Sequence, residues 1–310
     1  MDLVLTAGLG YGPEQLRIFL TSLHQVAPEA VPVVLGGRAL RARRSALRAF
    51  HPRTEVALVP DEGWRDFYTT RREWRLGPFK FSYRSLARQM RARASRRPLP
   101  PEGALPPNLT ATLHICVARF LWYREQLRDA YPGAERVLLS DARDVCFQRN
   151  PWEGNAAGLL CGLENISYHE EPSNREWITT SYSPEELEPL LSLPIVCSGV
   201  VLGCRAEALT YLEGMEEEIR QCFADIGGQV GIDQGLHNRL LRRRHAGLAT
   251  FEPVGGPVIA NLSCVPDEDL RLDPESGVLG RDGEPVAIVH QYDRLPRLVD
   301  WVNRRWPPAG

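Results

Sequence analysis

Residues 137–148 read VLLSDARDVCFQ, an apolar run that ends abruptly in two acidic residues, Asp141 and Asp144. Such an apolar run is typical of a strand that is buried on both faces of a parallel sheet. Ligands bind at the carboxyl ends of these strands, and acidic side chains placed there are costly unless a cation or an arginine neutralises them. The stretch therefore predicts an open α/β sheet with a charged site at one edge.

The two aspartates have two possible partners. Asp141 and Asp144 can share a divalent cation, because hard carboxylate oxygens suit Mg²⁺ or Mn²⁺. A metal held there would bind the diphosphate of a nucleotide and neutralise the charge that appears as it leaves. Alternatively, Arg143 pairs with both acids and forms a structural ion-pair corner. This stretch by itself leaves both interpretations open.

The rest of the chain alternates short apolar runs with helical patterns, as an α/β fold does. The simplest account is one continuous Rossmann-like α/β domain over residues 1–310, with a mixed, mostly parallel sheet flanked by helices. An arginine- and aromatic-rich stretch, Trp64–Arg97, and a proline-rich loop, Pro98–Pro107, interrupt the rhythm. We expect strands at Leu3–Thr6, Val31–Leu35, Glu55–Val59, Arg136–Ser140, Ile195–Gly203 and Val286–His290, and helices at Pro13–Val26, Ala39–Phe50, Tyr83–Arg97, Leu113–Tyr131, Pro184–Leu191, Leu209–Phe223 and Asp233–Arg243.

Composition narrows the class of protein. Hydrophobic residues make up 43% of the 310 and charged residues 25%, enough for a folded core. The 37 basic residues nearly balance 39 acidic ones, which argues against a nucleic-acid partner that covers the surface. No apolar run approaches the roughly 18 residues that span a bilayer. The first residues, Met1-Asp2, lack the basic region with which a secretory signal peptide begins, so we expect no signal peptide. The seven cysteines lack CxxC spacing, so we expect free thiols and a cytoplasmic protein.

A second candidate segment, GIDQGLHNRLL, covers residues 231–241. Asp233 stands where a helix is expected to begin, so it either caps that helix or contacts a ligand. Gln234 and Asn238 lie one helical turn apart on one face, and their amides can hydrogen-bond a polyol such as a sugar.

Two strand-like segments supply the remaining candidates. VAIVHQYDR, residues 286–294, ends a strand in His290, which is either a structural histidine or a metal ligand. CSGVVLGCRAEAL, residues 197–209, offers the Ser198 hydroxyl and a close backbone approach at Gly199. Its alternative is an ordinary glycine-bearing central strand.

The four segments together resemble a known family. A strand ending in DxxD, an SGV strand, a DQGLxN helix start and a late strand ending in histidine occur in this order in GT-A-type glycosyltransferases. DQGLHN is similar to the corresponding segment of the glycogenin and bacterial galactosyltransferase family. FQ-x-x-PW after the acidic pair and HQYDR near the end are closer to poorly characterised bacterial GT-A-like proteins. The resemblance runs from the first strand to about Arg294. It implies a metal-dependent transfer of sugar from a nucleotide-diphosphate donor of the UDP-linked kind to a glycan, protein or small-molecule acceptor.

The resemblance also implies roles for individual residues. Asp141 and Asp144 would stand for the metal-binding DxD, with His290 as the third ligand of Mn²⁺ or Mg²⁺. Asp233 and Gln234 would face the donor sugar and the reacting centre. Donor contacts would come from Thr6, Ala7, Gly8 and Tyr11 at the nucleobase and ribose, from Arg84, Arg119 or Arg294 at the diphosphate, and from Arg143, Ser198, Gly199 and Asn238.

Several alternatives stay open at this point. The motif is DxxD rather than DxD, so either aspartate can be the direct ligand, and we favour Asp144. A stabilising role for Asp233 implies retention at the anomeric carbon, whereas a base role implies inversion. About 1–150 would form the nucleotide-binding half and about 151–310 the acceptor and catalytic half. The stretch 168–177 would contact the acceptor or form a solvated loop.

Two other function classes compete with a transferase. One is a catalytically silent protein that binds a nucleotide or a glycan in the same fold. The other is a sugar nucleotidyltransferase, which we rank lower because the first-strand turn has no basic residue before Arg17.

Overall fold

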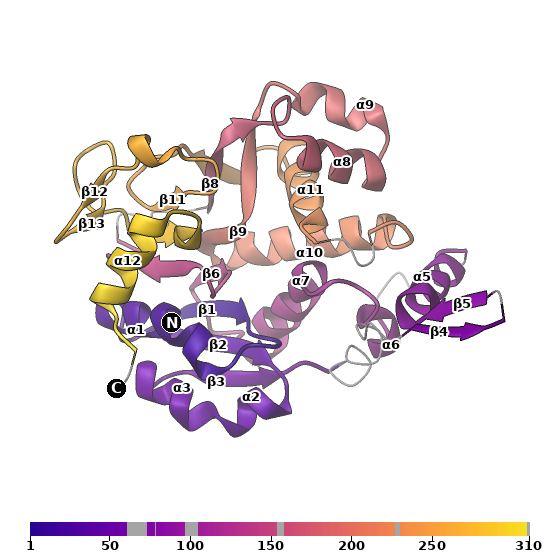
Figure 1. Cartoon of the computed structure of the whole chain (residues 1–310), viewed down its shortest axis with the longest axis horizontal. Helices are drawn as coiled ribbons and strands as arrows, with labels where there is room; N and C mark the ends of the chain where they lie inside the picture. The colour runs from indigo at the N-terminus through magenta and orange to yellow at the C-terminus, as the bar shows by residue number, and fades with distance from the viewer. Residues whose placement is uncertain (61–72, 78, 97–104, 154–157, 227–229, 309–310) are drawn as a thin grey trace.

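A seven-stranded sheet forms the centre of the molecule, in the order β10-β8-β9-β6-β1-β2-β3 (Figure 1). Neighbouring strands are parallel except at β9, which runs antiparallel to both β6 and β8. The predicted α/β class, with a mixed, mostly parallel sheet flanked by helices, is confirmed. The strands are β1 (Asp2–Ala7), β2 (Val31–Gly36), β3 (Glu55–Leu58), β6 (Arg136–Ser140), β8 (Leu159–Ser167), β9 (Pro194–Cys204) and β10 (Ala249–Glu252).

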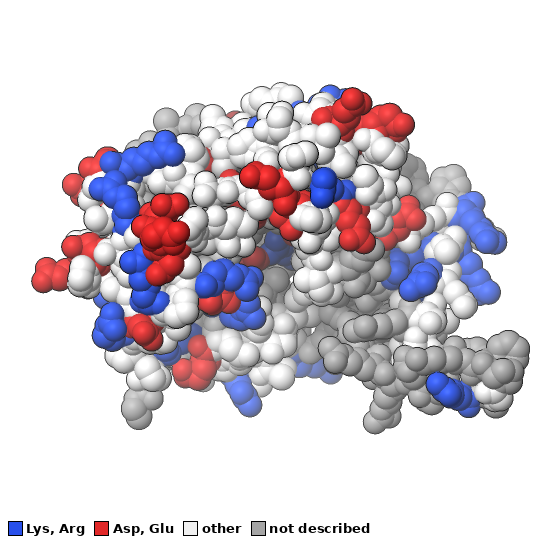
Figure 2. All heavy atoms as spheres, turned by 45° about the horizontal axis from the view of Figure 1, so that its top comes forward, with Lys and Arg blue, Asp and Glu red and all other residues white. Residues whose placement is uncertain are grey.

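This computed structural model describes residues 1–60, 73–77, 79–96, 105–153, 158–226 and 230–308. The first part of the arginine- and aromatic-rich stretch, residues 64–72, and most of the proline-rich loop lie outside the described residues. Strands β4 (Glu73–Leu76) and β5 (Phe79–Ser82) and helix α5 (Tyr83–Ala94) form an arm beside the main sheet, at the right of Figures 1 and 2. Among the described helices, none is both long and apolar enough to cross a bilayer.

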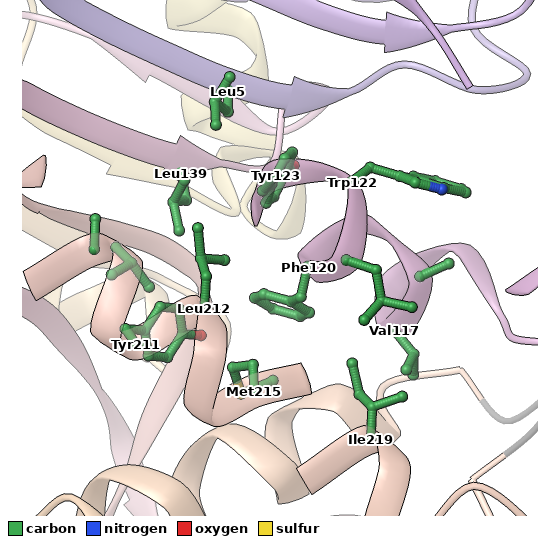
Figure 3. Close-up of a cluster of buried hydrophobic side chains, with 14 of the residues drawn as sticks. Leu5, Val117, Phe120, Trp122, Tyr123, Leu139, Tyr211, Leu212, Met215 and Ile219 are labelled. Atoms are coloured by element: carbon green, nitrogen blue, oxygen red, sulfur yellow. The ribbon is translucent and has the colours of Figure 1, made fainter. Parts of the chain in front are cut away.

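The strands of the main sheet are apolar on both faces, as the sequence of residues 137–140 predicts. Leu3, Leu5 and Leu139 point to one face, and Val4 and Leu138 to the other. On the first face they meet side chains of α7 and α10, as Figure 3 shows. The second face packs against α1. Two helical layers therefore cover the faces of the sheet and leave the carboxyl ends of its strands for the site.

The described helices are α1 (Pro13–Val26), α2 (Arg38–Ala42), α3 (Arg44–Phe50), α5, α6 (Pro107–Thr110), α7 (Ile115–Glu125), α8 (Pro172–Ser181), α9 (Pro184–Leu187), α10 (Arg205–Gln221), α11 (Ile232–Arg239) and α12 (Pro296–Arg305). Several predicted helices differ in detail from the observed ones. The helix expected at Ala39–Phe50 is broken at Arg43, where the backbone leaves the helical region. The one expected at Leu113–Tyr131 ends in a π-helical turn, Gln126–Ala130. The one expected at Pro184–Leu191 is a single α-turn followed by a 3₁₀ turn.

Strands β8 and β10 were not predicted from the sequence. β8 carries Gly162, Glu164 and Asn165 inside LLCGLENIS, and its pairing with β9 is irregular after Cys161. Polar residues and bulges of this kind remove the period-two signal of a strand.

A second, three-stranded sheet lies beside the main one. It consists of β7 (Val145–Phe147), β11 (Ile259–Asn261) and β14 (Ile288–His290), in the order β11-β14-β7. Buried side chains of this sheet pack with Trp301 of α12 in a separate apolar cluster. A further antiparallel pair, β12 (Leu272–Asp273) and β13 (Gly277–Val278), borders it. The second sheet carries the chain from the main sheet to the late histidine.

Candidate active site

Asp141, Asp144 and His290 come together at the carboxyl end of β6. Each offers one ligand atom, and these atoms all lie within 4.8 Å of one another. His290 Nε2 is 3.6 Å from Asp141 Oδ2 and 4.0 Å from Asp144 Oδ1. The three residues that the resemblance implies as metal ligands therefore lie close enough to share one cation.

Strand register explains why residues 146 positions apart in sequence converge. Asp144 directly precedes β7, and the last residue of β14, His290, pairs with Val145 across the antiparallel ladder. Asp141 directly follows β6, and its backbone N–H donates to the carbonyl of Gly199 on the neighbouring strand. The main sheet thus positions Asp141, and the second sheet positions Asp144 and His290.

Asn261 determines which nitrogen of His290 faces the acids. β11 and β14 run parallel with Asn261 beside His290 in register, and Asn261 Oδ1 lies 2.9 Å from His290 Nδ1. Cys197 Sγ lies 3.5 Å from the same nitrogen. A hydrogen bond from Nδ1–H to the amide oxygen leaves the lone pair of a neutral imidazole on Nε2, toward the two carboxylates.

Gly199 makes room for this arrangement. A Cβ atom at Gly199 would lie 2.3 Å from His290 Cε1 and 2.9 Å from Asp141 Oδ2. The close backbone approach predicted at this glycine exists, and the groups that use it are the side chains of the triad.

The charges of the triad are strongly coupled. Burial would raise the pKa of Asp141, but Arg119 and His290 lower it to about 2. Burial raises the pKa of Asp144. Burial would lower the pKa of His290, but Cys197, Asp141 and Asp144 raise it well above its usual range. An imidazolium can therefore balance the two acids, and a divalent cation would compete with its proton.

A cavity of about 460 Å³ opens beside the triad. Its volume lies within the range of small-molecule sites, about 300–1,000 Å³. Most of the residues predicted for the site line it: Ala7, Tyr11, Arg119, Asp141, Arg143, Asp144, Ser198, Gly199, Asp233, Gln234, His290 and Arg294.

Four predicted contacts do not line this cavity as described. The Thr6 hydroxyl is fully buried, and Gly8 packs against Val34 beneath the first-strand turn. Asn238 is wrong as a sugar contact, because its amide bonds both the N–H and the carbonyl of Val196. Arg84 belongs to α5, and its side chain lies outside the described residues.

Arg119 does not point freely to a diphosphate. The Arg119 side chain is 8% exposed. Its guanidinium pairs with Asp141 Oδ1 and lies 3.0 Å from Asp233 Oδ2. Ser198 Oγ donates to the same Asp233 oxygen at 2.9 Å. Gly231, not Asp233, is the N-cap of α11, so the capping role considered for Asp233 is wrong. Arg119 links the metal-site acid to the acid at the start of α11.

Two other arginines reach the cavity at its rim. Arg143 Nη2 donates to Asp293 Oδ2 at 3.1 Å, and Arg294 Nε lies 3.6 Å from Asp293 Oδ1. The ion-pair corner in which Arg143 holds both Asp141 and Asp144 is therefore wrong. Asp293 instead holds both rim guanidinium groups beside the triad.

A scan against protein-family models finds no match for this chain, and a search of curated proteins finds no significant match either. The site is therefore interpreted from its own geometry and chemistry.

The opposite wall of the cavity comes from β8 and α8. Glu171, Asn174 and Trp177 of the stretch expected to contact the acceptor line it, and part of that stretch is helix rather than loop. Tyr168 is buried in a separate apolar cluster. Gln234 Nε2 donates to Asn174 Oδ1 at 3.1 Å, which ties this wall to α11.

Sequence reasoning missed three groups that shape the site. Asn261 orients His290, Asp293 holds the rim arginines, and Glu164 lines the cavity, where burial raises its pKa. The signal for Asn261 was its place at the end of an apolar run, VIAN, like that of His290 in VAIVH. Recognising it needed the register between the two short strands.

Proposed function

We propose that this protein is a metal-dependent glycosyltransferase that moves a sugar from a nucleotide-diphosphate donor, UDP-linked by the resemblance, to an acceptor. The observation that carries the proposal is the convergence of Asp141, Asp144 and His290 beside a cavity of about 460 Å³. We place the activity in the cytoplasm, with residues 1–150 as the nucleotide-binding half and 151–310 as the acceptor half.

The donor atoms of the triad fit Mn²⁺ or Mg²⁺. Two carboxylates and one imidazole nitrogen form an O₂N set that leaves further coordination positions open. The Asn261 contact keeps Nε2 of His290 available, as outer hydrogen bonds commonly do at metal sites. When bound, the cation would supply a Lewis acid that neutralises charge on the diphosphate.

The rim arginines fit a diphosphate leaving group. Arg143 and Arg294 line the cavity, and their pairing with Asp293 keeps both guanidinium groups near the triad. Guanidinium groups pair well with phosphate oxygens because several N–H donors lie in one plane. In this proposal Arg143 and Arg294 contact the diphosphate, a role that the sequence also suggests for Arg84 and Arg119. Ala7 and Tyr11 would contact the base and ribose.

Asp233 fits a stabilising role better than a base role. Its Oδ2 already accepts from Arg119 and from Ser198, so the oxygen is engaged by a cation and a hydroxyl. With its lone pairs taken by these two contacts, this oxygen is not free to approach the hydroxyl of an acceptor. It can still stabilise positive charge on an adjacent sugar, which favours retention. Gln234 lines the same wall and would hydrogen-bond the sugar.

The test is turnover of nucleotide sugars by the purified protein. With Mn²⁺ and a panel of UDP-sugars, the wild type should release UDP slowly without an added acceptor. Asp144→Asn should release UDP at least about tenfold more slowly. Losing a residue that binds the metal directly costs at least as much as losing one that only orients such a residue. Asp129→Asn, a matched change at an exposed aspartate paired with Arg128, should keep the wild-type rate.

Two results would contradict the proposal. Metal-stimulated release that is equal in the wild type and Asp144→Asn would remove the triad from the reaction. UDP and Mn²⁺ that raise the melting temperature together, with no release from any donor, would instead indicate a silent binding protein.

A further inference from the structure

The arm beside the main sheet is strongly basic, and Glu73 is the one acidic residue in the sequences of β4, β5 and α5. Residues 74–101 hold eight of the chain's 37 basic residues and none of its 39 acidic ones. Helix α5 is the core of the described part of this arm. Figure 2 shows basic side chains gathered there, at the right-hand edge of the molecule. The proposed transfer reaction uses none of the described side chains of this helix.

Four exposed arginines of this surface have no acidic partner among the described residues. Arg75, Arg88, Arg93 and Arg96 are exposed, and none forms an ion pair in the part of the chain that the structure describes. Several arginines of the main body do have acidic partners: Arg124, for example, pairs with Glu216. Four unpaired guanidinium groups on one arm raise the local positive potential, and a polyanionic partner would relieve their repulsion.

An apolar side chain lies among these cations. Leu86 of α5 is 41% exposed and is one of few large hydrophobic side chains exposed in the described residues. It stands seven residues, or about two helical turns, before Arg93. A nucleic-acid backbone offers nothing to an exposed leucine, whereas the headgroup boundary of a bilayer accepts both a leucine and the surrounding cations.

The helix is fixed to the body rather than loosely attached. Ala87 on its inner side packs against Ala111, and Arg91 Nη1 donates to the Thr112 carbonyl at 2.7 Å. Helix α7 starts at Ile115, three residues after Thr112, and its first turn lines the cavity. A partner held by α5 therefore has a defined orientation relative to the cavity.

We propose that the exposed face of α5 and the turn after it, defined by Leu86, Arg88 and Arg93 of the helix and by Arg96 just beyond its end, with Arg75 beside it, binds an anionic phospholipid surface. Each arginine near an anionic bilayer contributes about a fivefold gain in binding, and the leucine adds burial at the headgroup boundary. The formal charge of the whole chain is −2, so the attraction is local and turns this arm toward the bilayer. This inference does not depend on the proposed transferase activity.

The test is sedimentation of the full-length protein with vesicles at low and at high salt. The wild type should sediment with vesicles of equal parts phosphatidylcholine and phosphatidylglycerol, much less at high salt, and not with phosphatidylcholine alone. The triple variant Arg88→Gln, Arg93→Gln, Arg96→Gln should bind roughly a hundredfold more weakly. Leu86→Ala should weaken binding by several-fold.

Matched variants separate this surface from charge in general. Arg281→Gln, Arg304→Gln, Arg305→Gln removes three exposed arginines elsewhere and should bind as the wild type does. The lysine version of the α5 triple variant should also retain binding, since the proposal needs charge rather than the guanidinium shape. Thermal melting checks that each variant is folded.

Five results would overturn the proposal. The wild type would fail to sediment with the anionic vesicles, or it would bind neutral vesicles equally. The glutamine triple variant at Arg88, Arg93 and Arg96 and the control triple variant elsewhere would lose binding equally. Alternatively, binding would depend on Arg41 and Arg44 of the basic α2–α3 segment. Binding to a duplex oligonucleotide at physiological salt without vesicle binding would assign the surface to nucleic acid.

Discussion

At the scale of single residues, the site depends on a side chain that touches neither acid. Asn261 accepts from His290 Nδ1 and so fixes the imidazole with Nε2 toward Asp141 and Asp144. Gly199 leaves the space in which that ring lies. In the proposed metal site the triad supplies the donor atoms, and its neighbours supply the orientation.

Asn261→Ala should weaken Mn²⁺ binding by about 10–100-fold, the usual cost of losing a hydrogen bond behind a metal-bound histidine. Asn261→Asp keeps an acceptor for Nδ1–H and should retain most of the affinity. Calorimetric titration of the metal into each variant measures the difference. Asn165→Ala, at an exposed asparagine nearby on β8, is the control, and equal loss in both alanine variants would refute the role.

At the scale of elements, the start of α11 depends on a glycine, Gly231, that any other residue would replace only at a cost in stability. Gly231 has φ +84 and caps the helix, and its Cα faces the ring of Trp177 on α8. A Cβ there would lie 2.4 Å from Trp177 Cζ2. This contact sets the place at which Asp233 and Gln234 enter the cavity wall.

Gly231→Ala should lower the free energy of unfolding more than Gly247→Ala does. Both glycines have positive φ, so both variants pay backbone strain of about 1–2 kcal/mol. A Cβ at Gly247 meets nothing within 4 Å, whereas at Gly231 it meets the indole, which adds about 1–3 kcal/mol of overpacking. Denaturant unfolding compares the two, and equal losses would show that the Trp177 contact is not tight.

The sequence predicts long, regular elements well and short partnered ones poorly. Helix α1 and strand β6 have the predicted bounds, because each buries a complete apolar pattern. The strands that bring His290 to the acids, β7, β11 and β14, are three residues each and are defined by their neighbours rather than by their own sequence. The order of the motifs predicted which residues form the triad, but not Asn261 or Asp293, whose roles come from register and from a turn.

At the scale of the whole molecule, acid stability reflects histidines that the fold keeps neutral. His237 is fully buried, and its Nδ1 lies 2.7 Å from the Tyr211 hydroxyl. Burial, followed by the charges of Arg119 and Arg242, lowers the pKa of His237 to about 3. Below the ordinary histidine pKa of about 6.5, the unfolded chain therefore binds a proton that the folded chain excludes. This contribution to stability is complete above that pH and is lost as the pH falls.

Removing this histidine should flatten the acid limb of the stability profile. Between about pH 6 and pH 4, the wild type should lose up to about 1.4 kcal/mol per pH unit more than His237→Asn, which has no group to titrate there. Urea unfolding of both proteins across this range gives the difference in slope. Parallel profiles would show that His237 takes up a proton in the folded state.

The central claim is that Asp141, Asp144 and His290 form one divalent-cation site. The electron paramagnetic resonance signal of free Mn²⁺, recorded as the protein is added, tests it most directly because bound ions leave that signal. The wild type should remove one Mn²⁺ per chain, Asp144→Asn and His290→Ala should remove almost none, and Asp129→Asn should match the wild type. No uptake by the wild type, or uptake unchanged by the Asp144 and His290 substitutions, would contradict the account.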